Sequence, residues 1–141
     1  MAPGEGPVQG DGAAGAATQE RVTSQLMQVS RAMVRIYKEQ FGRGPERVRS
    51  HYAGPDAIVC FLEQTLTPVE RTLAAIGEQQ RLRDMRMLFQ YAAEAEFRGA
   101  IEEITGRRVS AFVSGIDVDA DVASELFTFE PRNLDGTSQQ R

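Results

Sequence analysis

The chain has 141 residues, of which 41% are hydrophobic and 26% are charged. This composition is typical of one globular domain and excludes a disordered, fibrous or membrane-embedded chain. A net charge of -4 and a pI of about 5.1 make nucleic acid an improbable partner, because binding a polyanion needs clustered Lys and Arg. The single cysteine, Cys60, excludes an intrachain disulfide and a multi-cysteine metal site and fits a reducing compartment.

The composition divides the chain into one domain with two tails. Residues 1–18 are rich in Gly, Ala and Pro and bury too little to offset their ordering entropy, so we predict a disordered tail. Residues 131–141 have the same character and are predicted to be flexible, which leaves residues 19–130 as a single domain. The N-terminus lacks a signal-peptide pattern, and no apolar run reaches membrane-spanning length. We therefore expect a cytoplasmic protein that reaches a membrane only through a partner.

The first predicted element is a helix that ends at Phe41. Apolar side chains recur at alternating steps of four and three residues, which places them along one side of a helix. They are Val22, Leu26, Val29, Met33 and Ile36. Val34, Tyr37 and Phe41 widen this stripe, so we expect the helix to pack on a sheet, a second helix or a partner subunit. Gly42 ends the helix.

A β-hairpin is predicted next. Residues 47–53 alternate between a drier side and a wet side, as expected for a strand with one solvent-facing surface. The drier side carries Val48, Ser50 and Tyr52, and the wet side carries Arg47, Arg49 and His51. Residues 54–56 supply turn chemistry, and residues 57–62 form an apolar run typical of a strand buried on both faces.

A second helical segment begins with sharp start signals. Thr67 can cap the helix, Pro68 occupies its first position, and Glu70 completes a capping box. We predict that this helix bends or breaks near Gly77 and then continues as one helix over residues 79–105.

Two further strands complete the fold. Residues 109–116 and 126–129 are predicted strands, joined by the acidic segment 117–121. The order helix, hairpin, helix, hairpin predicts a two-layer sandwich of the α+β class, α-β-β-α-β-β. We expect a four-stranded, mostly antiparallel sheet with the helices on one face.

The sequence contains no recognisable catalytic, cofactor or metal site. His51, the only histidine, lies on the wet side of a strand, and Cys60 lies in an apolar strand that makes its thiol unreactive. Asp117, Asp119 and Asp121 match the first ligands of an EF-hand loop, but the glycine and the glutamate that complete such a loop are missing. We therefore expect no enzyme activity, no catalytic residue, no cofactor and no metal ion.

An arginine-rich loop after the first helix is one candidate for ligand or partner binding. It combines the flexibility of Gly44 with the guanidinium groups of Arg43, Arg47 and Arg49, and a loop of this type can hold a phosphate or a carboxylate. It is not a Walker A loop, because the lysine and the Ser or Thr are missing. The alternative is a helix end followed by the wet face of a strand.

The helical segment 78–86 is the second candidate. Its charged side chains are Arg81, Arg83, Asp84 and Arg86, together with Glu78. One interpretation is a solvated helix face whose charges pair within the helix. The other is a partner-binding surface, to which nearby residues add adaptable and aromatic area. These are Met85, Met87, Phe89 and Tyr91.

The order of these motifs resembles that of the MpsC-like family over about residues 24–129. The resemblance rests on FGRGP at 41–45, LTPVE at 66–70, TGRRV at 105–109 and SGID at 114–117. It implies a small soluble protein linked to a sodium-dependent system that generates membrane potential, or to cation or inorganic-carbon transport. It carries over no catalytic residues.

Together these observations favour a non-enzymatic accessory or regulatory protein that acts through protein–protein contacts. We expect a homo-oligomer with a protein partner, for example a membrane transporter subunit, because the apolar stripes of the helices exceed what one sheet face covers. The alternative is a sensor of a small anionic ligand or nucleotide that uses the arginines of the loop and the helix. A thermal shift with the anion distinguishes the two hypotheses.

Overall fold

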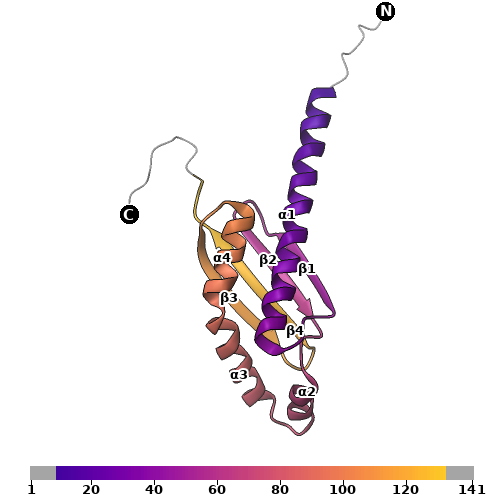
Figure 1. The fold of residues 1–141 in the computed structure, drawn as a ribbon, viewed down its shortest axis with the longest axis vertical. Coiled ribbons are helices and arrows are strands. Elements are labelled where there is room, and N and C mark those ends of the chain that lie inside the picture. The colour runs from indigo at the N-terminus through magenta and orange to yellow at the C-terminus, as the bar shows by residue number, and fades with distance from the viewer. Residues whose placement is uncertain (1–8, 133–141) are drawn as a thin grey trace, which may run out of the picture.

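The computed structural model describes residues 9–132 and has two layers, a sheet and a set of helices on one of its faces (Figure 1). The four strands follow the order β1-β2-β4-β3, and each neighbouring pair is antiparallel. This arrangement confirms the predicted α+β sandwich. The elements in chain order are α1 (Gln9–Phe41), β1 (Arg47–Tyr52), β2 (Ala57–Glu63), α2 (Pro68–Ala75), α3 (Gln79–Ala92), α4 (Glu94–Thr105), β3 (Val109–Asp117) and β4 (Val122–Phe129).

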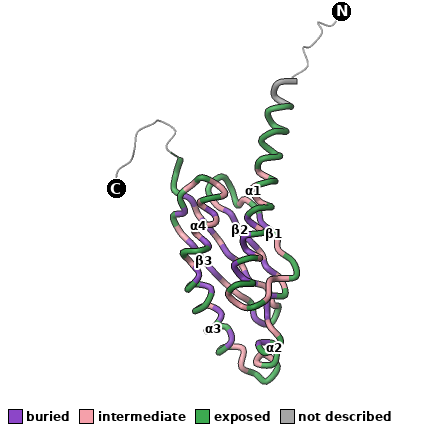
Figure 2. The backbone as a smooth tube through the Cα atoms, in the orientation of Figure 1, coloured by how far each residue is buried: buried purple, intermediate pink, exposed green. Residues whose placement is uncertain are grey.

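Helix α1 has 33 residues, and only its second half lies on the sheet (Figure 2). Val29, Met33 and Tyr37 are fully buried there, whereas residues 13–21 are exposed. The helix includes residues 9–18, which we predicted to belong to a disordered tail; Ala has the highest helix propensity even where no apolar stripe marks a helix. The rest of that tail, and residues 133–141 of the C-terminal one, lie outside the described residues.

The first hairpin has the strands that the sequence predicts, and the second hairpin has a longer last strand than predicted. On β1 the side chains of Arg47, Arg49 and His51 are exposed and Ser50 is buried. Strand β4 begins at Val122 and not at residue 126 as predicted. The predicted boundary was wrong because the polar residues in the first half of β4 hide its alternation.

In the helical segment between the two hairpins, the start at Thr67 and the break near Gly77 were predicted correctly, whereas the break at Ala93 was not predicted. Thr67 Oγ1 accepts a hydrogen bond from the Glu70 N–H at 3.2 Å, and Glu70 Oε1 accepts one from the Thr67 N–H at 2.9 Å, which confirms the capping box. Gly77, with φ of +87°, separates α2 from α3 as predicted. The single helix predicted over residues 79–105 is wrong, because the chain leaves helical geometry at Ala93, where φ is -91° and ψ is 9°.

The main core lies between the sheet and helices α1 and α4. Phe97 stacks on Phe112 with ring centroids 5.4 Å apart, and Phe112 contacts Phe127 at 5.3 Å. The apolar stripe of α1 is covered from Val29 onward by this core, so that part of α1 needs no partner to bury it. Among residues 9–132, no helix combines the length and the apolar character needed to cross a bilayer.

Candidate functional site

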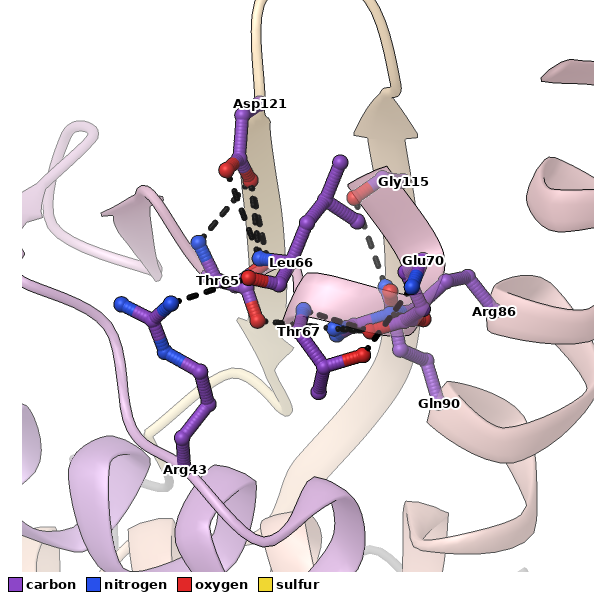
Figure 3. A network of polar contacts seen from close by, with 9 residues as sticks. All are labelled: Arg43, Thr65, Leu66, Thr67, Glu70, Arg86, Gln90, Gly115 and Asp121. Atoms are coloured by element: carbon purple, nitrogen blue, oxygen red, sulfur yellow. Dashed lines mark hydrogen bonds and ion pairs between the residues drawn. The ribbon is translucent and has the colours of Figure 1, made fainter. Parts of the chain in front are cut away.

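Arg86 is buried inside the protein and does not lie on the surface of α3, where we expected it (Figure 3). Its Nε and Nη2 donate to the two carboxylate oxygens of Glu70, each at 2.6 Å, and Nη2 also donates to the Thr65 carbonyl at 2.8 Å. The guanidinium carbon lies 3.6 Å from the centroid of the Phe41 ring. Arg86 therefore joins α3 to α2 and to the end of α1.

The carboxylate of Glu70 stays charged in this pair. Burial alone would raise the pKa of Glu70, but the hydrogen bonds and the charge of Arg86 outweigh burial and lower the pKa below its ordinary value of 4.5. The Glu70 carboxylate therefore forms a bidentate, charge-assisted pair with the Arg86 guanidinium. Such a pair stabilises the fold. It also occupies the Nε and Nη2 donors of Arg86, so these two groups cannot bind an external anion together.

The loop that precedes α2 is held from two further sides (Figure 3). Asp121, at the β3–β4 turn, accepts hydrogen bonds from the backbone N–H groups of Thr65 at 2.9 Å and Leu66 at 3.2 Å. Arg43 donates to the carbonyls of Leu66 at 3.0 Å and Gln64 at 3.1 Å. Asp121 and Arg43 therefore anchor a loop. In the described part of the chain no group of three or more His, Cys, Asp and Glu side chains is placed to hold a metal ion.

A second polar cluster lies in the core, on the side of the sheet that the helices cover. Strand register places one polar residue of each strand in a row, in the order Ser50, Cys60, Glu125 and Ser114. Tyr37 donates to Glu125 Oε1 at 2.6 Å, and Gln90 Nε2 donates to Ser114 Oγ at 2.6 Å. Burial raises the pKa of Glu125 to about 8 and that of Cys60 to about 12. Both groups are therefore mainly neutral near pH 7.

The burial of this cluster limits the chemistry it can perform. Glu125 and Cys60 are both 0% exposed, so neither can reach a substrate in solution. Burial and the neighbouring Glu125 also raise the pKa of Tyr37 well above its ordinary value. The cluster gives the core specific polar contacts between α1, α3 and the sheet, and it offers no accessible acid, base or nucleophile.

In the structure, the arginines of the arginine-rich loop contact other residues of the same chain. Arg47 and Arg49 extend from β1 toward Glu63 on β2, with nitrogen–oxygen distances of 4.0 and 3.3 Å. Gly44 lies against α1, where a Cβ would stand 3.1 Å from Val34 Cγ1. The loop therefore has the geometry of a helix end followed by a strand with a solvent-facing side. Of the two interpretations of the sequence, this is the alternative to an anion-binding loop.

On α3 the remaining candidates lie at the surface. The Arg81 side chain is 84% exposed and lies 3.3 Å from Glu78 one turn earlier. Asp84 accepts a hydrogen bond from Gln80 at 2.9 Å. Arg83 lines a shallow hollow that also contains Asp117 and Asp119, and these carboxylates disfavour an anionic ligand there. The structure thus brings Arg83 together with acidic groups and does not group the predicted arginines into one site.

The sheet face opposite the helices, here called the open sheet face, has an apolar centre. It consists of Val59, Phe61, Val113 and Leu126. Register aligns Val59, Leu126 and Val113 side by side on neighbouring strands. Val113 is 51% exposed and the others are partly exposed. Arg49 lies over the Phe61 ring at 5.4 Å, so the apolar centre borders a basic edge.

A second uncovered apolar surface runs along α3. It consists of Met85, Leu88, Phe89 and Ala92, spaced at steps of three, one and three residues along one side of the helix, and is here called the α3 stripe. Met85 is 37% exposed, Leu88 68% and Phe89 41%. The surplus of apolar surface predicted from the sequence therefore lies on α3 and on the sheet, and not on the sheet-bound half of α1.

Comparison with protein families identifies the chain. A family model described as Na+-translocating membrane potential-generating system (MpsC) matches residues 22–131. The chain belongs to the MpsC family. The match begins within α1 and ends just after β4, so it spans the whole sandwich of the MpsC domain. Comparisons with curated proteins and with solved structures give no match.

The family description places the MpsC domain in the context of a Na+-translocating system that generates membrane potential. No helix in the part of the chain that the structure describes crosses a membrane. The family description therefore connects the chain with a membrane system.

Sequence reasoning missed the buried polar residues. Glu125 shares the inward face of β4 with Ala123 and Phe127, so an alternating pattern read back from Phe127 would have placed it in the core. Gln90 lies one turn after Arg86 on the buried side of α3, and the polar character of both residues hid that side. The missed signal in each case is a polar residue in an inward-facing position.

Proposed function

We propose that this MpsC protein is a non-enzymatic accessory subunit that acts through protein–protein contacts at its open sheet face. The observation that carries the proposal is the apolar centre of that face, which the helices leave uncovered. An antiparallel sheet that simply faces water alternates apolar side chains inward with polar ones outward. An apolar centre on the outer face favours a covering protein.

The edge of the open sheet face indicates the character of this partner. Arg47 and Arg49 share Glu63 in exposed ion pairs, and such pairs contribute little in water and exchange readily. Arg is enriched at protein interfaces because its fork binds carboxylates and its plane stacks on aromatic rings. We expect a partner surface with an apolar centre and acidic groups along the side that meets β1.

The family description connects the chain and its proposed partner with a membrane system. A chain whose described helices do not cross a bilayer contributes to a membrane-potential-generating system by contact with a subunit that does. We place this contact on the cytoplasmic side of the membrane, where a reduced Cys60 is expected. In this role the protein regulates or assembles the system and moves no ion itself.

Two substitutions on β3 test the proposal. Val113→Glu puts a charge in the apolar centre, and Ser110→Glu puts the same charge at the margin of the open sheet face; both positions are exposed, so the fold should tolerate both changes. In cells that contain the membrane subunits of the system, we expect Val113→Glu to abolish co-sedimentation with membranes and to lower the sodium-dependent membrane potential measured with a dye. Ser110→Glu should keep both. A Val113→Glu protein that still sediments and supports the potential would refute the proposal.

A further inference from the structure

The α3 stripe has a symmetric pattern of residue types about its centre. Leu88 and Phe89 flank the midpoint, and Met85 and Ala92 lie equally far from it on either side. Further out, Arg81 at the start of α3 and Glu96 in α4, beyond the break at Ala93, are again the same number of residues from the midpoint. Reversing the direction of α3 therefore exchanges the large Met85 with the small Ala92. Reversing the longer segment 81–96 also exchanges the positive Arg81 with the negative Glu96.

This pattern lies on a surface that its own chain covers only in part. The buried side of α3 carries Leu82, Arg86 and Gln90, whereas Leu88, at the middle of the stripe, is 68% exposed. Phe89 borders the end of α1, with its ring centroid 6.3 Å from that of Phe41. The stripe is thus an apolar strip at the margin of the core.

We propose that the α3 stripe is the interface with a second copy of this chain, in which the two α3 helices pack antiparallel about a two-fold axis between Leu88 and Phe89. Leu88 then packs on the partner's Phe89, and Met85 fills the space above the partner's Ala92. Arg81 meets the partner's Glu96 at both ends of the contact.

The α3 stripe is self-complementary, so a second copy of this chain fits it. A two-fold interface uses the same patch on both subunits, so each residue must suit the residue found at the reversed position. The α3 stripe meets this condition at both of its pairs of positions, Leu88 with Phe89 and Met85 with Ala92, and the flanking Arg81 and Glu96 form a third pair of opposite charge. In antiparallel helix pairs, the ridges formed by side chains three or four residues apart also pack into the grooves of the partner helix.

The charges at the ends of the stripe permit this pairing. Within the chain, Arg81 pairs with Glu78 at 3.3 Å while its side chain is 84% exposed. An exposed pair of this kind contributes little free energy, so little is lost when Arg81 pairs with another carboxylate. Like charges would meet if the helices packed in parallel, because Arg81 would then face Arg81. The charges therefore select the antiparallel orientation.

This dimer is independent of the proposed function. It occupies α3 and leaves the open sheet face free for the membrane-system partner. A Val113→Glu protein should remain dimeric, and a protein altered in the α3 stripe should keep the open sheet face intact. Failure of one proposal is thereby distinguished from failure of the other.

Engineered cysteines test the orientation. In the antiparallel dimer Met85→Cys lies opposite the partner's Ala92→Cys, so the double variant should form a disulfide-linked dimer under mild oxidation. The two positions of one helix are about 10 Å apart along its axis, beyond the Cα separation of about 7 Å that a disulfide can bridge, so an intrachain bond cannot form. Each single variant should stay monomeric on a non-reducing gel, and native Cys60 is buried and does not interfere.

Sedimentation equilibrium tests the interface itself. The wild-type protein should be dimeric at micromolar concentration, and Leu88→Asp should raise the dimer dissociation constant at least about 30-fold, as for loss of a central interface contact. Arg81→Glu and Glu96→Arg should each weaken the dimer, and the double charge exchange should restore it. A monomeric wild type, a dimer that Leu88→Asp leaves intact while circular dichroism shows a native fold, or a double cysteine variant that never cross-links would overturn the proposal.

Discussion

Glu125→Gln is expected to stabilise the protein near neutral pH and to remove a pH dependence. The Glu125 carboxyl group is 0% exposed, and burial raises its pKa to about 8, although hydrogen bonds from Tyr37, Ser114 and Gln90 oppose the rise. Glu125 Oε2 and Gln90 Oε1 have no hydrogen-bond partner in the described structure. A neutral glutamine binds no proton on folding, and its side-chain oxygen can still accept the hydrogen bond from Tyr37.

The size of the effect follows from the two pKa values. The unfolded chain ionises Glu125 near its ordinary value of 4.5, and the folded chain does so near 8. Between these values the folded state binds more protons, so its stability falls as the pH rises. Each pH unit costs about 1.4 kcal/mol, and the whole interval at most about 5 kcal/mol. This contribution is fully present below pH 4.5 and is lost above pH 8.

Urea unfolding of the wild type and of Glu125→Gln, measured from pH 5 to pH 9, tests this reasoning. The difference in the free energy of unfolding should grow in favour of Gln up to about pH 8 and then level off. Glu103→Gln, which changes an exposed carboxyl group on α4, is the control and should parallel the wild type. If the curves for Glu125→Gln and the wild type run parallel, the pKa of the buried Glu125 carboxyl group is not raised and the reasoning is refuted.

Three further predictions concern the polar contacts. Glu70→Ala leaves Arg86 buried without its counter-charge and should lower the free energy of unfolding by about 3–5 kcal/mol in urea titrations; an effect below 1 kcal/mol would contradict the burial of the pair. Asp121→Ala removes the acceptor of two buried backbone N–H groups and should cost about 1–3 kcal/mol, whereas Asp121→Asn, which keeps an acceptor oxygen, should cost less; equal losses would argue against the loop anchor. Phosphate and nucleotides should leave the melting temperature unchanged, because the loop arginines have partners within the chain; a concentration-dependent rise would revive the anion-sensor hypothesis.

Local chemistry made part of the fold predictable. The helix start at Thr67, the break at Gly77 and the alternation of β1 each depend on residues close in sequence. Capping, left-handed turn geometry and side-chain alternation act within a few residues. The four strands and the order of the elements followed from these local features together with the rule that one sheet face must be covered.

The candidate site was less predictable, because the role of an arginine depends on what surrounds it. Arg81 and Arg86 occupy similar positions in one charged segment, yet Arg81 is exposed and Arg86 is fully buried. The partner of Arg86 is Glu70, on another helix. No spacing rule connects these two residues, since the contact exists only after α2 and α3 have packed together.

The class of the fold, the element order and the family could be predicted from the amino-acid sequence, because periodicity, caps, turns and short motifs are properties of neighbouring residues. Packing of the elements against one another sets which polar groups are buried, that α3 ends and α4 begins around Ala93, and which apolar surfaces remain uncovered. Glu125 is the clearest case: its pKa is raised because α1, α3 and the sheet together exclude water from it, and desolvation is set by all the elements around a group at once.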